Sequence, residues 1–331
     1  MFKRKLGKSG IEASVIGLGT WVTGGWMWGG ADDNESIKAI HAGLDSGIDL
    51  IDTAPVYGFG HSEEVVGKAI KDRRDKVILA TKCGLVWDKV AGVLHFTSNE
   101  KGVTKDEVKY SVYKYLNPDS IREEVERSLK RLQTDYIDLY QTHWQDETTP
   151  IADTMGMLEK LKDEGKIRAI GVSNASVDQM KEYGNIDSAQ EKYNMLARKL
   201  DENGITDYCS ENEIAILAYS PLANGLLTGK INENSKFGEG DLRINNSFFT
   251  SDNIRKVNSM LSEMSPAAEQ TGKTIAQLVM AWTLQRKGIT HLLVGARNEK
   301  QAIENAGGGN SLLLHEHVLL VDEIFSSHFP G

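Results

Sequence analysis

Short apolar runs alternate with longer amphipathic segments along most of the chain. Runs such as VIGLGT (15–20) and IDLIDT (48–53) are typical of buried strands, and the segment between them has helical spacing and ends at a glycine. The same pair of signals repeats, which predicts eight strands that are each followed by a helix. The strands are 15–20, 48–53, 76–84, 136–143, 166–174, 187–194, 214–221 and 289–296, and the helices are 31–47, 62–70, 119–133, 151–165, 176–183, 205–213, 272–288 and 298–309.

The sequence also predicts an N-terminal hairpin, a helix cap and two long irregular stretches. The opening FKRKLGKSGIEASV predicts a β-hairpin that turns at 7–10. Asp119 or Ser120 is the expected cap of the helix at 119–133. The longest irregular stretches, 84–118 and 222–251, both follow predicted strands.

The alternation also indicates a fold class. Strands separated by helices pair in parallel, and eight such units are the number that closes a barrel. The competing fold, an open doubly wound sheet, usually has a G-x-G-x-x-G turn after its first strand, but in GLGTWVTGG (17–25) the sixth position is Val22. We therefore predict one α/β domain over 1–331, a (β/α)8 TIM barrel with an N-terminal hairpin and long loops at the C-terminal face of the barrel.

Composition narrows the function classes. The chain of 331 residues has a net charge of −9 and no basic block, which argues against nucleic-acid binding. No apolar run is long enough for a signal peptide or a membrane span, and the two cysteines, Cys83 and Cys209, suit a reducing compartment, so we expect a cytoplasmic protein. The eight histidines lack metal-ligand spacing, and no metal is predicted.

Ionisable side chains stand where three of the predicted strands end. Asp52 and then Tyr57 follow the second strand, Lys82 ends the third, and His143 ends the fourth. An Asp–Lys pair alone is more often structural, but strand ends of a barrel converge on one pocket. We expect Asp52 to pair with Lys82, Lys82 to lower the pKa of Tyr57, and His143 to hydrogen-bond the same substrate oxygen. Such a set protonates an oxygen on which negative charge develops.

Several motifs, in order and over nearly the whole chain, resemble those of the aldo-keto reductases. They are DTAPVYGFGHSEEVVG (52–67), ATKCG (80–84), DLYQTHW (138–144), GVSN (171–174), AYSPLANGLLTGK (218–230) and GARNEKQAIEN (295–305). The resemblance is closest to a bacterial branch with general stress reductases and to the β subunits of potassium channels. It implies a barrel that binds NADPH, a small carbonyl substrate, and catalysis by Asp52, Tyr57, Lys82 and His143. No docking surface is evident in the sequence, so we expect no obligate protein partner.

The resemblance also implies the cofactor contacts. Ser173, Asn174 and Gln190 would hold the carboxamide, and Tyr219 would stack on the nicotinamide. Ser220, Pro221, Leu222 and Gly225 would meet the pyrophosphate, and Lys230 and Arg297 the phosphates, with Arg243 as a weaker candidate. Gln301 and Asn305 would lie toward the adenine. Further contacts are expected from Gly19, Thr20, Trp21, Asp52 and Gly295.

Two positions depart from the family pattern. Gln145 stands where many members have proline, and Gly295 stands where many animal members have the lysine that pairs with the 2′-phosphate. Arg297 is expected to compensate for that lysine, since arginine suits phosphate recognition, and NADPH is therefore favoured over NADH.

Aromatic residues near the strand ends suggest a substrate pocket. Trp21, Trp87 and Trp144 are expected to wall it and to favour an apolar or aromatic carbonyl, with Trp26 and Trp28 as a flexible lip. Packing under loops is the equally weighted alternative for these residues. Cys83 is either a redox sensor or, more in keeping with a barrel wall, an inert small residue.

Two other functions remain open at this point. One is a redox-sensing ancillary subunit that binds NADPH and turns over slowly. The other is a lyase that uses Lys82 as a Schiff base, against which Asp52 argues by keeping the amine protonated.

Overall fold

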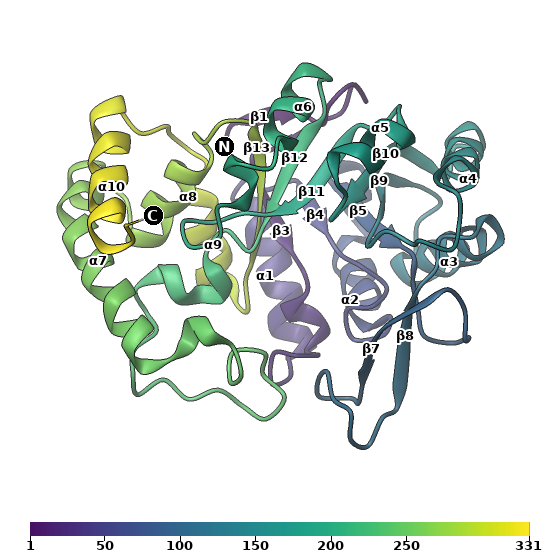
Figure 1. The fold of residues 1–331 in the computed structure, drawn as a ribbon, viewed down its shortest axis with the longest axis horizontal. Helices are drawn as coiled ribbons and strands as arrows, with labels where there is room; N and C mark the ends of the chain where they lie inside the picture. Colours follow the sequence, from purple (N-terminus) through teal and green to yellow (C-terminus); the bar gives the residue numbers. More distant parts are fainter. Residues whose placement is uncertain (331) are drawn as a thin grey trace.

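The computed structural model describes residues 1–330 and has a closed barrel of eight parallel strands at its centre (Figure 1). Neighbouring strands follow one another around the barrel in chain order, and the last, β13, pairs with the first, β3, through Leu293 and Gly17. The predicted (β/α)8 barrel is confirmed. Its strands are β3 (Ile16–Gly19), β4 (Leu50–Asp52), β5 (Ile78–Cys83), β9 (Ile137–Thr142), β10 (Ile167–Ser173), β11 (Ser188–Lys192), β12 (Ala215–Tyr219) and β13 (Ile289–Gly295).

Helices surround the barrel and connect its strands (Figure 1). Every predicted helix is present, within a few residues of its predicted bounds: α1 (Asp33–Asp45), α2 (His61–Ile70), α3 (Pro118–Leu132), α4 (Ile151–Asp163), α5 (Val177–Tyr183), α6 (Ile205–Glu211), α8 (Ile275–Thr283) and α9 (Glu299–Gly307). Two helices were not predicted, α7 (Ser251–Gln270) and α10 (His315–His328), and they pack against each other. Within residues 1–330, no helix is both long and apolar enough to cross a membrane.

The predicted hairpin, β1 (Lys3–Lys5) and β2 (Glu12–Ser14), covers the N-terminal end of the barrel. Leu6 is fully buried and packs with Leu50 and Leu217 of the barrel interior. The turn needs a glycine at position 7, because its φ is +57° and a Cβ there would lie 2.0 Å from the carbonyl oxygen of Asp187. This end of the barrel is therefore filled by side chains, and the chemistry is left to the other end.

Two local predictions were wrong. Helix α3 begins at Pro118, and Asn117 is its cap, because the Asn117 side chain accepts from Asp119 N at 3.0 Å. The stretch 84–118 is not irregular: it holds a three-stranded antiparallel sheet of β6 (Leu85–Val86), β8 (Tyr110–Lys114) and β7 (Val93–Ser98). The stretch 222–251 does stay largely irregular, with short 3-10 turns at Ala223–Thr228 and Ser247–Phe249.

Three loops meet over the C-terminal end of the barrel, and we call them the mouth loops: 21–31, 99–103 and 238–243. Met27 N donates to Lys101 O at 3.0 Å, and Leu242 N donates to Met27 O at 2.9 Å. The Lys101 ammonium forms an ion pair with Glu239 at 2.7 Å. The loops thus form a roof above the strand ends.

Candidate active site

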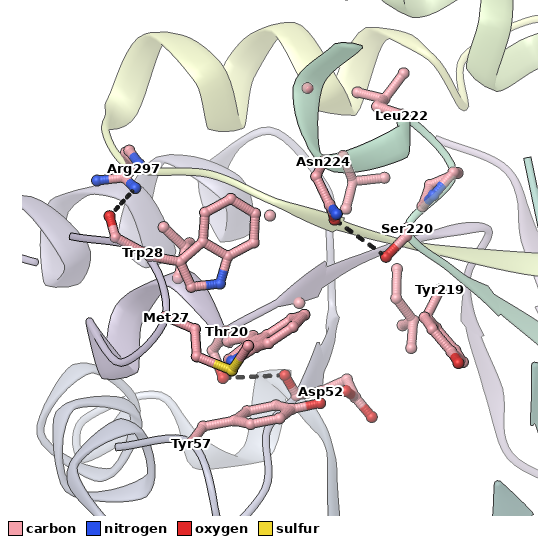
Figure 2. A pocket seen from close by; sticks show the side chains of 18 of the residues that line it. Thr20, Met27, Trp28, Asp52, Tyr57, Tyr219, Ser220, Leu222, Asn224 and Arg297 are labelled. Atoms are coloured by element: carbon pink, nitrogen blue, oxygen red, sulfur yellow. Dashed lines mark hydrogen bonds between the residues drawn. The ribbon is translucent and has the colours of Figure 1, made fainter. Parts of the chain in front are cut away.

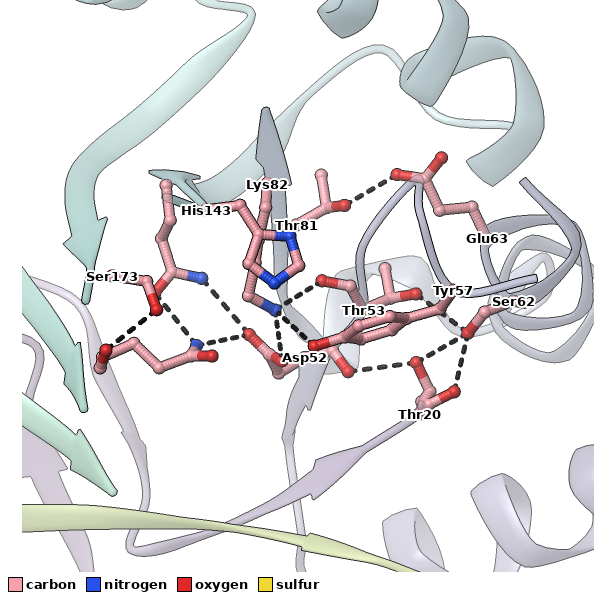
Figure 3. A network of polar contacts seen from close by, with 12 residues as sticks. Thr20, Asp52, Thr53, Tyr57, Ser62, Glu63, Thr81, Lys82, His143 and Ser173 are labelled. Carbon is pink, nitrogen blue, oxygen red and sulfur yellow. Dashed lines mark hydrogen bonds and ion pairs between the residues drawn. The ribbon is translucent and has the colours of Figure 1, made fainter. Parts of the chain in front are cut away.

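The four ionisable residues predicted to meet do lie together at the C-terminal end of the barrel (Figure 3). Asp52 ends β4, Lys82 lies near the end of β5, His143 follows β9, and Tyr57 lies in the loop before α2. Lys82 Nζ donates to Asp52 Oδ2 at 2.7 Å and to Thr53 O at 2.8 Å, and it lies 3.4 Å from the Tyr57 hydroxyl. The His143 ring stands edge-on to Tyr57, with 5.8 Å between their centroids.

Buried hydroxyl groups fix the loop that carries Tyr57. Ser62 Oγ donates to Thr20 and lies 3.0 Å from Thr53 Oγ1, and Thr20 Oγ1 donates to Asp52 O at 3.0 Å (Figure 3). Gly58 has φ +67°, and a Cβ there would lie 2.4 Å from Gly24 O. The phenol is therefore held by a turn with little room to move. Sequence reasoning did not identify Thr53 or Ser62.

The second carboxylate oxygen of Asp52 is also occupied. Gln141 Nε2 donates to Asp52 Oδ1 at 3.2 Å, and Gln190 Nε2 donates to the same oxygen at 2.8 Å. Gln190 was predicted to hold a carboxamide, and here its nitrogen is committed to Asp52. Gln141 was not predicted, although it lies on β9 only two residues before His143, a spacing that favours the same side of the chain. Both glutamines fix the orientation of Asp52.

Burial dominates the electrostatics of this group. It raises the pKa of Tyr57 well above its usual value, and the negative charge of Asp52 adds to that shift. The net shift is opposite to the lowering expected from Lys82, because desolvation of the phenol disfavours the phenolate. Burial also lowers the pKa of Lys82, against the opposing effect of Asp52.

The surroundings of His143 favour its neutral form. Burial lowers its pKa well below the usual value for histidine, and the positive charge of Lys82 contributes in the same direction. A neutral imidazole and a protonated phenol therefore face each other across a small space. Together they offer hydrogen-bond donors to one oxygen atom without a formal charge on either ring.

Polar side chains at the ends of β10 and β12 are hydrogen-bonded to one another. Tyr219 OH donates to Asn174 Oδ1 at 2.9 Å, and Asn174 Nδ2 donates to His143 O at 3.1 Å and to Ser173 Oγ at 3.0 Å. Asn174, Ser220 and Asn224 all have φ of +55°. Such conformations cost about 1–3 kcal/mol each and persist at sites where the surrounding structure imposes them.

One cavity of about 560 Å³ joins these groups to the mouth loops (Figure 2). Every residue predicted to contact the cofactor lines it, as do Tyr57, His143 and Trp144. Trp87 does not line it, and its ring instead packs against Phe59 with 5.5 Å between centroids. Sequence reasoning missed some of the lining residues, which include Met27 and Val103 of the mouth loops and Phe96 of β7.

Trp26 is not a flexible lip. Its side chain is buried, Nε1 donates to Ser98 Oγ at 2.9 Å, and its ring stacks on Phe96 with 5.6 Å between centroids. Trp26 therefore ties the first mouth loop to β7 and forms a rigid part of the cavity wall.

Lys230, Arg243 and Arg297, the predicted cationic residues, also line the cavity; we call the part of the cavity beside them its far end. Lys230 forms an ion pair with Glu304. Arg243 pairs with the buried Asp241, with contacts of 2.8 and 2.6 Å. Arg297 has no ion pair among the described residues, and it donates to the backbone oxygens of Trp28 and Gly30. Partial desolvation and the positive charge of the nearby Arg243 lower the pKa of Arg297, although the residue as a whole is exposed. We call Arg243 and Arg297 the guanidinium pair.

Cys83 lies behind the site in the barrel wall and is buried. Burial raises its pKa well above the usual value for a thiol, and the charge of Glu124 acts in the same direction. The thiolate that redox chemistry requires is therefore disfavoured, which supports the inert alternative.

The chain matches the model of the Aldo/keto reductase family over residues 15–325. It is 44% identical to aldo-keto reductase YhdN of Bacillus subtilis, over 88% of this chain and 84% of the relative. It is 40% identical to the NADH-specific methylglyoxal reductase of Escherichia coli, over 98% of both chains. A probable voltage-gated potassium channel subunit beta of Arabidopsis thaliana is 31% identical, over 91% of this chain and 89% of that protein.

Solved structures agree with this match. The glycerol dehydrogenase of Gluconobacter oxydans superposes with a TM-score of 0.85 at 38% identity, covering 99% of this chain and 96% of that one. An aldo-keto reductase of Klebsiella pneumoniae, solved in complex with NADPH, superposes with a TM-score of 0.70 at 28% identity, covering 98% and 96%.

Proposed function

Because the chain belongs to the aldo/keto reductase family, we propose that it reduces aldehyde or ketone carbonyls to alcohols with NADPH, and that Tyr57 is the proton donor. The observation that carries this proposal is the contact of Lys82 Nζ with both Asp52, at 2.7 Å, and the Tyr57 hydroxyl, at 3.4 Å, at the wall of the cavity. A buried ammonium beside a phenol has little structural use, because hydrophobic residues fill a barrel at lower cost.

The proton step follows from these contacts. Bound NADPH would supply a hydride to the carbonyl carbon, so negative charge grows on the carbonyl oxygen. Tyr57 donates its proton to that oxygen, and the phenolate left behind is stabilised by the ammonium of Lys82. Asp52 keeps Lys82 in place, and His143 orients the oxygen as a neutral hydrogen-bonding group.

The lining residues fit a dinucleotide of this kind. Ser173, Asn174 and Tyr219 present amide and hydroxyl groups beside His143, where a carboxamide would lie. Backbone groups at 220–225 would meet the pyrophosphate, opposite Gly19, Thr20 and Trp21 on β3 and its loop, with Gly295 on β13. Lys230, Gln301 and Asn305 would hold the adenosine end together with the guanidinium pair.

The charge at the far end supports NADPH over NADH. The guanidinium pair carries two positive charges and is balanced by the single carboxylate of Asp241. A 2′-phosphate would supply the missing negative charge and accept bidentate hydrogen bonds, which a ribose hydroxyl does not. The E. coli relative bears the name of an NADH-specific enzyme, so both cofactors belong in the assay.

The substrate end is mainly aromatic. Trp21, Trp26, Phe96 and Trp144 line it around Tyr57 and His143. This supports aldehydes with an apolar or aromatic substituent. Methylglyoxal, from the name of one relative, is the small polar comparison substrate for reduction. Glycerol, from the name of another, is an alcohol and tests the reverse oxidation with NADP⁺.

The test is the absorbance of NADPH during incubation with benzaldehyde and methylglyoxal. We expect turnover that falls by about 10²–10⁴-fold in Tyr57→Phe, because the general acid is removed. A rate within a few-fold of wild type in that variant would show that Tyr57 is not the acid. Tight NADPH binding with negligible turnover of every carbonyl would instead favour the ancillary-subunit alternative.

A further inference from the structure

Trp28 lies beside Arg297 (Figure 2) and also contacts Arg243, at the end of the cavity away from Tyr57. Its ring centroid is 5.2 Å from the guanidinium carbon of Arg243 and 5.7 Å from that of Arg297. Arg297 also donates to the backbone oxygen of Trp28. Both guanidinium groups therefore contact one residue of the first mouth loop.

The opposite side of Trp28 contacts the catalytic end. Its ring meets Trp21 edge-on, with 5.6 Å between centroids and an interplanar angle of 85°. Trp21 in turn stacks on Tyr57, with centroids 6.0 Å apart and an angle of 24°. A continuous series of side-chain contacts thus connects the guanidinium pair to the proposed proton donor.

No hydrogen bond locks either indole. Trp21 Nε1 and Trp28 Nε1 are buried and have no partner among the described residues. Buried tryptophan N–H groups usually find an acceptor, and Trp26 does so with Ser98 Oγ. The position of Trp28 is therefore determined by its ring contacts and by Arg297, and Gly29 and Gly30, both with positive φ, follow it directly.

Arg297 is the less firmly held member of the pair. Arg243 is anchored by two contacts to Asp241, whereas Arg297 bonds only backbone oxygens of Trp28 and Gly30. A guanidinium has five N–H donors, so Arg297 keeps donors for an anion while it holds Trp28. A phosphate group between the two arginines would anchor Arg297 and, through it, Trp28.

We propose that Trp28 is a positioning residue that couples the 2′-phosphate of NADPH to the substrate end of the cavity. The phosphate fixes Arg297, Arg297 fixes Trp28, and Trp28 orders Trp21 beside Tyr57. This inference rests on the proposed function. It predicts that the carbonyl substrate binds more tightly when the bound cofactor has a 2′-phosphate, and that this advantage depends on the ring at position 28.

The experiment compares the KM for benzaldehyde at saturating NADPH and at saturating NADH. In wild type we expect the KM to be about 5-fold or more lower with NADPH, the lower end of ordinary coupling between sites. Trp28→Ala should bring the ratio close to one by raising the KM measured with NADPH, whereas Trp28→Phe, which keeps an aromatic ring, should retain most of it. A wild-type ratio of one, or an equal rise of KM with both cofactors in Trp28→Ala, would overturn the inference.

A second measurement does not depend on turnover. Adenosine 2′,5′-bisphosphate, which lacks the nicotinamide, is titrated while tryptophan fluorescence is recorded. We expect a change in wild type that is lost in Trp28→Phe and retained in Trp87→Phe, which removes an indole outside the cavity lining. The same change in all three proteins would contradict a role for Trp28. Failure of wild type to reduce any carbonyl would contradict the proposed function, and the titration would then decide the inference alone.

Discussion

The ammonium of Lys82 lies 2.7 Å from a carboxylate oxygen of Asp52, and both side chains are buried on adjacent strands of the barrel. Asp52 pairs in register with Ala80, and Lys82 lies two residues further along β5, so the two side chains share the interior face. Their contact follows from the register and does not depend on any loop.

Replacing Asp52 with Asn should destabilise the protein and slow catalysis together. The variant leaves the buried ammonium of Lys82 without its charged partner, and breaking a buried pair in this way costs about 3–5 kcal/mol. Urea unfolding should show this loss, and kcat should fall more than KM rises, because Lys82 acts in the transition state. The double variant Asp52→Asn/Lys82→Met should regain stability but not activity. If the single variant Asp52→Asn keeps both the stability and the kcat of wild type, the proposed role of Asp52 is wrong.

Removing the guanidinium pair should change cofactor preference. Arg297→Met and Arg243→Met should each raise the KM for NADPH about 10-fold or more and leave the KM for NADH within about 3-fold, because only NADPH presents the 2′-phosphate. Arg255→Met is the matched control, since Arg255 on α7 forms only exposed ion pairs, with Glu233 and Asp252. Equal losses for NADPH and NADH would place the arginines at a phosphate that both cofactors share.

Glu124 makes stability depend on pH. Burial raises its pKa to about 7, whereas an unfolded glutamate titrates near 4.5. The folded state therefore binds this proton more tightly, so its contribution to stability is complete below about pH 4.5 and is lost as pH rises through 7. Over that range the free energy of unfolding of wild type should fall relative to Glu124→Gln by about 3 kcal/mol.

Urea unfolding at pH 5 and pH 8 measures this difference, with the exposed Glu159→Gln as the control. The gap between wild type and Glu159→Gln should be the same at both pH values. If the difference in unfolding free energy between wild type and Glu124→Gln is also the same at pH 5 and pH 8, Glu124 does not titrate in this range.

The hairpin turn offers a test of the closed end of the barrel. Gly7→Ala would bring a Cβ to 2.0 Å from the carbonyl oxygen of Asp187, and the φ of residue 7 is +57°. We therefore expect the free energy of unfolding to fall by more than the roughly 1–3 kcal/mol that backbone strain alone costs. Gly10→Ala is the matched control, because Gly10 also has positive φ but a Cβ there meets no atom within 4 Å. Equal losses in thermal or urea unfolding would mean that backbone conformation alone determines the effect.

The barrel and its strand ends were predictable because both follow from local periodicity. Lys82 and His143 end apolar runs, and parallel strands bring such ends together. The loops were not predictable in the same way. The sheet of β6, β8 and β7 depends on pairing between segments that carry no strong alternation, and Trp26 becomes rigid only through its contacts with that sheet.

The pKa values and the hydrogen-bond partners of the site were the hardest features to predict from the sequence. The raised pKa of Tyr57 is due mainly to desolvation of the phenol, with a contribution from the charge of Asp52, and no residue pattern reveals this. The commitment of Gln190 to Asp52 likewise depends on side-chain packing across the barrel interior, because β11 and β4 lie on opposite sides of the closed barrel.

The pairing of β13 with β3 has a consequence for biosynthesis. Arg4 Nη1 donates to Thr290 O, 286 residues further along the chain, and β3 pairs with β13 beside that contact. While the chain is being made, β3 therefore has an unpaired edge until nearly the whole sequence has left the ribosome. We expect nascent chains that stop before β13 to be targets of chaperones, and release of the last strand to be the event that allows the barrel to close.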